Sequence, residues 1–346
     1  MNRLQSALRD IRGYPTLRAA KRLFDRKPLQ CSLYVTDQCN LDCAYCTEYD
    51  NSRPHPSLVD LTRWLTRIRD LGTVRVALVG GEPLMHPDIV EIVRRAKQLG
   101  LSTSLTTNGF LLTRSLVEGL EEAGLEVMQI SVDRMTPSQV TRKSFKTVLP
   151  KLDVLADSSI NVHITGVLCD DTMSESRAVL KTGLDRGVPT EVRLVHADPN
   201  RQFRVEPGER DRLETFLLWM RQAKEAGVKI HTNDAILNYQ LSLVRGEQVD
   251  WVCAAGFKIF FVSAQGKFWL CSMRHTDQDI MDVTPAHLLA NDGPKSCQDG
   301  CGVYCCVNTS MLYQNPVRMI GREVRLRLKR IPAPAPQSAP RGAEGM

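Results

Sequence analysis

Three kinds of feature are missing from the sequence, and each absence excludes a class of protein. No apolar run in its 346 residues is long enough to span a bilayer, and the N-terminus lacks the hydrophobic segment of a secretory signal peptide. No G-x-G-x-x-G motif follows the first expected strand, which argues against an open dinucleotide-binding sheet. No stacking or groove-reading module is recognisable, so nucleic acid is not an expected partner. A cytoplasmic globular protein is the remaining expectation.

Cysteine, by contrast, is abundant. The chain has eleven cysteines, and in a sequence without a secretion signal this odd number favours a reducing compartment and metal or redox use. Hydrophobic content of 42% and charged content of 24% are ordinary for a globular protein. A length of 346 residues suits two domains, or one large α/β barrel with an appendage.

Positive charge is concentrated at the two ends of the chain. Residues 1–30 contain eight basic and two acidic residues, and residues 316–346 contain seven basic and two acidic residues. Since the whole chain has a net charge of +6, the body between them is mildly acidic. The basic ends are either solvated helical faces or contacts to an acidic partner, which leaves peripheral membrane binding open.

Strand and helix patterns alternate from Gln30 onwards. The expected strands are 30–36, 73–79, 101–106, 126–132, 160–168 and 190–196, and the expected helices are 57–70, 87–99, 113–123, 136–156 and 174–186. Alternating β and α units argue for parallel strands with right-handed crossovers. Six such units predict an α/β fold of the partial (β/α)6, TIM-like barrel type.

The most informative stretch follows the first expected strand. Cys39, Cys43 and Cys46 have C-x3-C-x2-C spacing, and three thiolates on one short loop suit an iron–sulfur cluster. Such a set leaves one iron of a four-iron cluster open to a small molecule. A structural zinc site is the alternative, but it normally has four ligands, and the loop holds no fourth cysteine or histidine.

Polar and turn-forming residues also follow the later strands. They are Gly80 to Pro83, Thr106 to Gly109, Ser131 to Asp133, and, after the sixth strand, Arg193, His196 and Asp198. In barrels of this type chemistry occurs at the carboxyl ends of the strands, so these residues are expected to converge on one face.

Together these residues resemble the radical S-adenosylmethionine (SAM) superfamily. The cysteine motif with Tyr45 before its last cysteine, paired with Gly-Gly-Glu-Pro after the second strand, is the specific part of the resemblance. The resemblance covers residues 30–196. It implies that Cys39, Cys43 and Cys46 ligate a 4Fe–4S cluster, and that SAM chelates the fourth iron.

The resemblance also implies SAM-binding roles for residues at the strand ends. These are Tyr45, Gly80, Gly81, Glu82, Pro83, Asn108, Ser131 and Asp133. The Tyr45 ring suits a position near the adenine, the two glycines allow close backbone approach, and Glu82 can accept from the SAM ammonium. Ser131 and Asp133 suit the ribose hydroxyls or the SAM carboxylate. The implied reaction is hydrogen abstraction by a 5′-deoxyadenosyl radical, with electrons from a flavodoxin- or ferredoxin-type donor.

The C-terminal half contains a second group of cysteines. Helices are expected at 206–226 and 233–245, followed by a hairpin from Phe257 to Cys271 with Cys253 just before it. The spacing C-x12-G-x4-C and the cysteine-rich tail resemble the SPASM/twitch extension of radical SAM enzymes. This implies one auxiliary 4Fe–4S cluster on Cys253 and Cys271, with two further ligands among Cys297, Cys301, Cys305 and Cys306. Structural zinc is the alternative.

These observations predict five segments and one function. The segments are 1–28, a basic amphipathic helical segment; 29–200, the radical SAM partial barrel; 201–250, connecting helices; 251–310, the auxiliary-cluster domain; and 311–346, a basic stretch with a Pro/Ala-rich tail. The expected function is a radical SAM enzyme of unidentified substrate. A ribosomal peptide and a lipid at a membrane surface are alternative substrates, and an iron–sulfur or zinc scaffold is the non-enzymatic alternative.

Residues that face the substrate are the least defined part of the prediction. Glu48, His163, Arg193, His196 and Trp269 could line the cavity, although a lone histidine on a strand is more often structural. Isolated cysteines usually pack as apolar residues, which is the expectation for Cys31 and Cys169. A role near the substrate stays open for Cys169.

Overall fold

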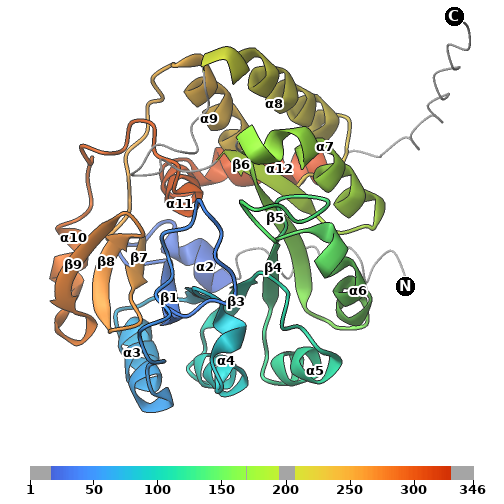
Figure 1. Cartoon of the computed structure of the whole chain (residues 1–346). Helices are drawn as coiled ribbons and strands as arrows, with labels where there is room; N and C mark the ends of the chain where they lie inside the picture. Colours follow the sequence, from blue (N-terminus) through green and yellow to red (C-terminus); the bar gives the residue numbers. More distant parts are fainter. Residues whose placement is uncertain (1–16, 169, 195–206, 329–346) are drawn as a thin grey trace, which may run out of the picture.

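A computed structural model describes residues 17–168, 170–194 and 207–328, and these form one nine-stranded sheet with flanking helices (Figure 1). Its first six strands are β1 (Gln30–Thr36), β2 (Arg75–Gly80), β3 (Ser102–Thr107), β4 (Val127–Ser131), β5 (Asn161–Leu168) and β6 (Thr190–Leu194). They pair in sequence order and every pairing is parallel. The α/β class with a partial TIM-like barrel is therefore confirmed.

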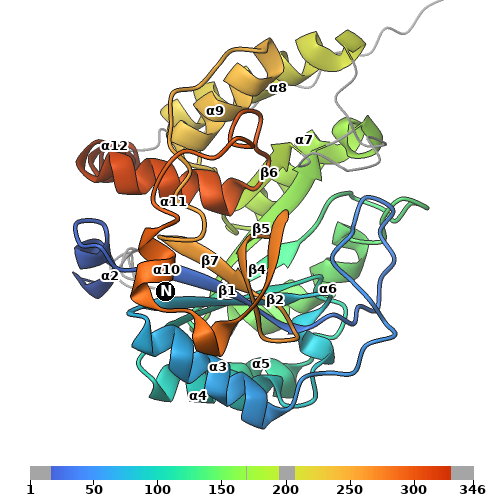
Figure 2. The same ribbon diagram turned by 90° about the vertical axis from the view of Figure 1, so that its left-hand side faces the viewer.

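Helices alternate with these strands as expected. They are α2 (Leu17–Arg22), α3 (Leu58–Asp70), α4 (Ile89–Gln98), α5 (Arg114–Glu122), α6 (Phe145–Ala156) and α7 (Asp170–Asp185). Thr113 caps α5, since its hydroxyl accepts from the Leu116 N–H at 3.3 Å. Helices α3, α4 and α5 lie along one side of the sheet (Figure 2). Residues 2–16 of the expected N-terminal helix, together with Cys169, His196 and Asp198, lie outside the described residues.

The two faces of the sheet differ in polarity. On β1, Cys31, Leu33 and Val35 are fully buried in the hydrophobic core, so Cys31 packs as an apolar residue. On the opposite face, strand register aligns Gln129 with His163. Because side chains alternate along each strand, polar residues share this second face, which is the one that a ligand inside the barrel would meet.

The C-terminal half adds three strands to the same sheet. Its elements are α8 (Arg210–Glu225), α9 (Asp234–Arg245), β7 (Ile259–Val262), β8 (Lys267–Cys271), β9 (Arg274–Asp279), α10 (Pro285–Leu289), α11 (Tyr304–Gln314) and α12 (Pro316–Leu328). The expected hairpin is present as the antiparallel pair β7–β8, and β7 runs parallel to β1. One hydrophobic core includes side chains from Cys31 to Val307. The hairpin is thus a continuation of the barrel sheet.

One expected helix is wrong in its first half. The sequence predicted a helix over 136–156, whereas α6 begins only at Phe145. Residues 134–144 fold back as a loop, because the N–H groups of Asp133 and Arg134 both donate to the Lys143 carbonyl, at 3.0 and 3.2 Å. This loop covers the cysteine loop, where the Ala44 N–H donates to the Val140 carbonyl at 2.9 Å.

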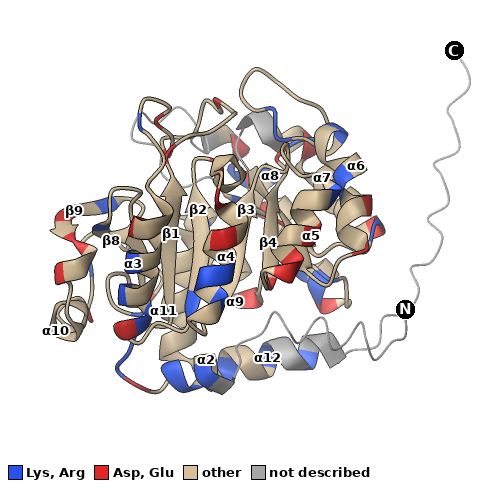
Figure 3. Ribbon diagram, turned by 90° about the horizontal axis from the view of Figure 1, so that it is seen from below, with Lys and Arg blue, Asp and Glu red and all other residues tan. Residues whose placement is uncertain are grey.

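The basic ends of the chain meet on one side of the molecule. Seen from below, α2 and α12 lie side by side and both carry Lys and Arg (Figure 3). Ile320 of α12 and Leu312 of α11 pack against the cluster that contains buried Ala19 and Leu23, which holds α2 and α12 together. In the described part of the chain, no helix is both long and apolar enough to cross a bilayer.

Candidate iron–sulfur and SAM site

The cysteine loop lies between β1 and α3, at the carboxyl end of β1. Cys43 is buried, and Cys39 and Cys46 are half-buried. The Cys43 thiol contacts the Thr141 hydroxyl at 3.3 Å. The three thiols therefore lie on one short loop that the 134–144 loop covers.

Lys143 supplies positive charge to this loop. Burial raises the pKa of Cys39 and of Cys46, and Lys143 lowers both. Burial by itself would lower the pKa of Lys143, but the Tyr45, Asp133 and cysteine groups outweigh it, so the pKa is raised well above its ordinary value. The Lys143 ammonium also lies 5.4 Å from the centre of the Tyr45 ring. Lys143 is therefore a cation held beside three potential thiolates.

Glu82 joins the ends of β2 and β3. Its side chain is 1% exposed and accepts from the Thr107 hydroxyl at 2.7 Å, the Asn108 N–H at 2.7 Å and the Leu84 N–H at 3.0 Å. Burial raises its pKa, while these hydrogen bonds act in the opposite direction. Pro83, also buried, follows at the start of a short 3-10 turn. Glu82 thus fixes the loop that the sequence assigned to SAM.

Gly80 and Gly81 pack against the chain that leaves β1. A Cβ atom at Gly80, where φ is +150°, would lie 2.2 Å from the Thr36 carbonyl oxygen. A Cβ atom at Gly81 would lie 2.4 Å from the Gln38 carbonyl oxygen. Both contacts are with backbone, which cannot move aside cheaply. The structure therefore gives these glycines a packing role, in addition to the ligand approach that the sequence predicted.

Asp133 connects four segments of the site. Its buried carboxylate accepts from the Val167 N–H at 2.8 Å, the Thr141 hydroxyl at 3.3 Å and the Tyr45 hydroxyl. Tyr45 is consequently tied to the end of β4. The predicted contacts of Asp133 with the ribose and of Tyr45 with the adenine stay predictions. The structure adds the hydrogen bond between these two side chains.

Asn108 and Ser131 complete the set of strand-end residues. The Asn108 side-chain amide donates to the Asn40 side-chain oxygen at 2.8 Å, which links the end of β3 to the cysteine loop. Ser131 is half-buried and aligned with Thr165 on β5. The residues expected at the carboxyl ends of β1 to β4 therefore gather around the cysteine loop.

The second group of cysteines also comes together. Burial, and then the Cys253, Cys271 and Cys297 thiols, raise the pKa of Cys301 to about 12. A hydrogen bond with Cys306 lowers the pKa of Cys271 to about 6. Because electrostatic effects of this kind act over short distances, Cys253, Cys271, Cys297 and Cys301 share one neighbourhood. In addition, the Arg274 guanidinium donates to the Cys297 thiol at 3.6 Å.

Tyr34 lies between the two groups of cysteines. Its hydroxyl donates to Glu48 at 2.6 Å, and its ring packs edge-on against Trp269 with the centroids 5.4 Å apart. Burial, Glu48, and then the Cys305 and Cys46 thiols raise its pKa. A residue from each group therefore acts on the same side chain. Two of the expected cavity residues, Glu48 and Trp269, are its direct neighbours.

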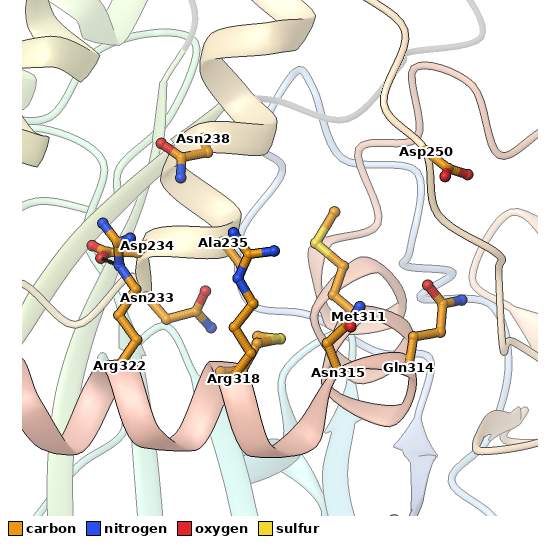
Figure 4. Close-up of a pocket in the computed structure, with 11 residues that line it drawn as sticks. Asn233, Asp234, Ala235, Asn238, Asp250, Met311, Gln314, Asn315, Arg318 and Arg322 are labelled. Atoms are coloured by element: carbon orange, nitrogen blue, oxygen red, sulfur yellow. Dashed lines mark hydrogen bonds and ion pairs between the residues drawn. The ribbon is translucent and has the colours of Figure 1, made fainter.

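A cavity of about 190 Å³ lies elsewhere, between α9 and α12 (Figure 4). Arg322 of α12 pairs with the nearly buried Asp234 of α9 at its edge. Its lining includes none of the residues assigned above to the cluster or to SAM. This cavity therefore does not contribute to the candidate site.

Comparison with known proteins assigns one domain of the chain, less than half of its length, to a family. The family model described as "Radical SAM superfamily" matches residues 33–182. Residues 33–182 are a radical SAM domain. Members of this family use a 4Fe–4S cluster together with SAM, as the sequence resemblance implied.

Curated relatives match the radical SAM domain over part of their length. Molybdenum cofactor biosynthesis protein 1 of Homo sapiens is 31% identical over 187 residues, covering 51% of this chain and 29% of that protein. GTP 3′,8-cyclase of Chlorobaculum tepidum is 36% identical over 143 residues, covering 39% of this chain and 43% of that protein. The chain thus spans less than half the length of these relatives.

Solved structures resemble the chain over a longer range. Native anSMEcpe with bound AdoMet has a TM-score of 0.61 at 17% identity, covering 86% of this chain and 100% of that one. Streptococcus suis SuiB bound to precursor peptide SuiA has a TM-score of 0.61 at 16% identity, covering 84% of this chain and 73% of that one. At this identity the likeness concerns the fold, and it extends well beyond the radical SAM domain.

Sequence reasoning missed the loop that covers the cysteines. Thr141 and Lys143 contact the radical SAM cysteine loop, yet both lie in a stretch interpreted as helix. Pro137 disfavours a helical conformation at Thr136 but is compatible with a helix that begins at Pro137, so it did not mark residues 137–144 as a loop.

Proposed function

We propose that the chain is a radical SAM enzyme in which Cys39, Cys43 and Cys46 hold a 4Fe–4S cluster, with SAM at its open iron. When bound, these cofactors supply a 5′-deoxyadenosyl radical that abstracts a hydrogen atom from the substrate. The observation that carries the proposal is the convergence of the cysteine loop with the loops after β2, β3 and β4. Glu82, Asn108 and Asp133 tie those loops together by hydrogen bonds.

The side chains fit such a group chemically. Three thiols on one short loop suit a cluster, and Lys143 offsets the negative charge that thiolates would bring into a buried loop. Ser131 and the remaining acceptor capacity of Glu82 are our proposed contacts to SAM, with Gly80, Gly81 and Pro83 shaping the backbone beside it. Asp133 holds Tyr45 in place for the adenine.

We propose one auxiliary 4Fe–4S cluster on Cys253, Cys271, Cys297 and Cys301. These four thiols are mutual electrostatic neighbours, whereas Cys306 is already within hydrogen-bond reach of Cys271 and Cys305. Tyr34 and Trp269, between the two groups of cysteines, are then placed beside the substrate. Electrons would come from a low-potential donor of the flavodoxin or ferredoxin type.

A peptide is the substrate class that we favour. SuiB with its precursor peptide and anSMEcpe with a peptide resemble this chain over 84% and 86% of its length. PqqA peptide cyclase of Gluconobacter oxydans is also 33% identical over 118 residues. A nucleoside triphosphate, as in the GTP cyclases, needs several unpaired cations, but within the described residues Arg193 pairs with Glu191 and Lys143 faces acidic groups.

The test is anaerobic SAM cleavage by the reconstituted full-length protein. With SAM and dithionite we expect 5′-deoxyadenosine from the wild type and none from the Cys39→Ala, Cys43→Ala, Cys46→Ala triple variant. Cleavage by the triple variant at the wild-type rate would contradict the assignment. Short synthetic peptides should stimulate turnover more than GTP, and stimulation by GTP alone would assign a nucleotide substrate.

A further inference from the structure

A group of side chains that the proposed chemistry does not use lies on the polar face of the sheet. His163 on β5, Glu191 on β6 and His231, in the segment after α8, bring three ligand atoms within 4.8 Å of one another. No other three His, Cys, Asp or Glu side chains do this in residues 17–168, 170–194 and 207–328. The group lies toward the amino ends of β5 and β6, whereas the cysteine loop follows the carboxyl end of β1.

The backbone fixes the positions of all three residues. Thr165, two residues after His163, is aligned with Glu191 in the β5–β6 register. The His231 N–H donates to the Thr190 carbonyl at 3.1 Å, so the segment after α8 runs beside β6. The three side chains therefore come from adjacent, hydrogen-bonded segments rather than from independent loops.

Glu191 has the surroundings of a metal-binding carboxylate. It is fully buried, and its Oε1 atom accepts from the Thr165 hydroxyl at 3.1 Å and from Arg193. Its Oε2 atom accepts from the Thr232 hydroxyl at 2.9 Å, which leaves one lone pair on that oxygen. Carboxylate ligands are commonly oriented by such outer hydrogen bonds.

His163 has the matching arrangement for an imidazole ligand. Its Nε2 atom lies 3.3 Å from the Gln129 side-chain oxygen. An amide oxygen only accepts, so Nε2 carries the proton and Nδ1 keeps its lone pair. A metal-binding histidine usually donates its other ring N–H to an oxygen in this way.

The two imidazole rings of the group lie face to face. The His163 and His231 rings stack with centroids 4.1 Å apart and an angle of 14° between their planes. An imidazole points its lone pair along its ring plane, so one of the two rings must turn for both to bind the same ion.

We propose that His163, Glu191 and His231 bind one divalent transition-metal ion, separate from the iron held by the cysteines. Two imidazoles and one carboxylate are a ligand set used for Zn²⁺ and Fe²⁺. Three protein ligands leave further coordination positions open on the side of the barrel interior. Arg193, paired with the other carboxylate oxygen, orients Glu191 for this role.

Zinc provides the test, because it can be counted apart from cluster iron. Full-length protein with reconstituted clusters is loaded anaerobically with Zn²⁺, desalted and analysed for zinc and iron. We expect one zinc per chain, with a zinc absorption edge that shows nitrogen and oxygen ligands at about 2.0–2.1 Å and no sulfur at about 2.3 Å. Zinc bound through sulfur would overturn the proposal.

Variants locate the ion. His231→Gln and His163→Gln should each lower bound zinc at least tenfold without changing iron, while His275→Gln, at an exposed histidine on β9, should keep the wild-type amount. Wild-type zinc in both His231→Gln and His163→Gln overturns the assignment. Glu191→Gln is secondary, because removing a fully buried carboxylate also tests folding. Zinc content does not depend on SAM cleavage, so the proposed metal site and the proposed radical SAM activity can each fail without the other.

Discussion

The buried Asp133 carboxylate accepts hydrogen bonds from Tyr45, Thr141 and Val167. The most distant of these residues, Tyr45, lies 88 residues away in the sequence. The sequence predicted that Asp133 belongs to the site because it ends a strand. It did not predict these partners, because contacts between distant segments leave no local periodicity. The same holds for Glu82, whose three donors belong to the 3-10 turn and to the end of β3. Single residues at strand ends were therefore predictable, and their hydrogen bonds were not.

Replacing Asp133 tests whether it holds the site together. Asp133→Ala leaves the Val167 N–H and the two hydroxyls without their acceptor, so we expect about 2–4 kcal/mol lower stability. Tyr45→Phe removes only one of the three hydrogen bonds and should lower the free energy of unfolding by about 1 kcal/mol. Thermal unfolding with iron analysis measures both. Equal unfolding temperatures for the wild type and Asp133→Ala would contradict this role.

The glycine pair makes a second prediction. Gly80→Ala and Gly81→Ala place a methyl group within 2.2 and 2.4 Å of a backbone carbonyl, so the loop must move and SAM binding should fall at least tenfold. Gly187→Ala is the matched control. It also has positive φ, +74°, but no atom lies within 4 Å of its added Cβ. Equilibrium binding of SAM to all three reconstituted proteins provides the measurement, and unchanged binding by both loop variants would refute the packing argument.

At the level of elements, the regular βα units were predictable and the irregular connection was not. The six barrel strands and the hairpin occur where alternation and turn residues placed them. The loop over 134–144 was missed because backbone bonds to the Lys143 carbonyl and to the cysteine loop decide its course, and such contacts leave no local pattern in the sequence. β9 was missed because its residues, Arg274 to Asp279, are polar and form an exposed edge strand.

The 134–144 loop should act on the cluster through Lys143. Removing this positive charge from beside the cysteine loop makes an added electron less favourable, so Lys143→Gln should shift the cluster midpoint potential to more negative values, by on the order of tens of millivolts. Lys146→Gln removes an exposed charge at the second residue of α6 and should leave the potential unchanged. Redox titration followed by electron paramagnetic resonance compares them. A positive shift, or equal shifts in both variants, would argue against this role.

Across the whole molecule, the two groups of cysteines flank one continuous sheet but pack in different clusters. Cys39, Cys43 and Cys46 pack with Leu41 and Tyr45, whereas Cys253, Cys271 and Cys306 belong to the main hydrophobic core. β7 pairs directly with β1, and Tyr34 lies near a cysteine of each group. The family match covers residues 33–182, so the auxiliary cluster depends on the geometry of the later cysteines rather than on the family. The substrate was not predictable from sequence, because the residues that we propose to face it come from β1, β6, β8 and α11, elements that only the tertiary fold brings together.

The central claim is that the two groups of cysteines hold two separate clusters, and counting iron in matched variants tests it most directly. Anaerobically reconstituted wild type should contain about eight irons per chain. The Cys39→Ala, Cys43→Ala, Cys46→Ala variant and the Cys253→Ala, Cys271→Ala variant should each retain about four, and only the second should still cleave SAM. Four irons in the wild type with zinc bound to sulfur, or loss of all iron from either variant, would contradict the account.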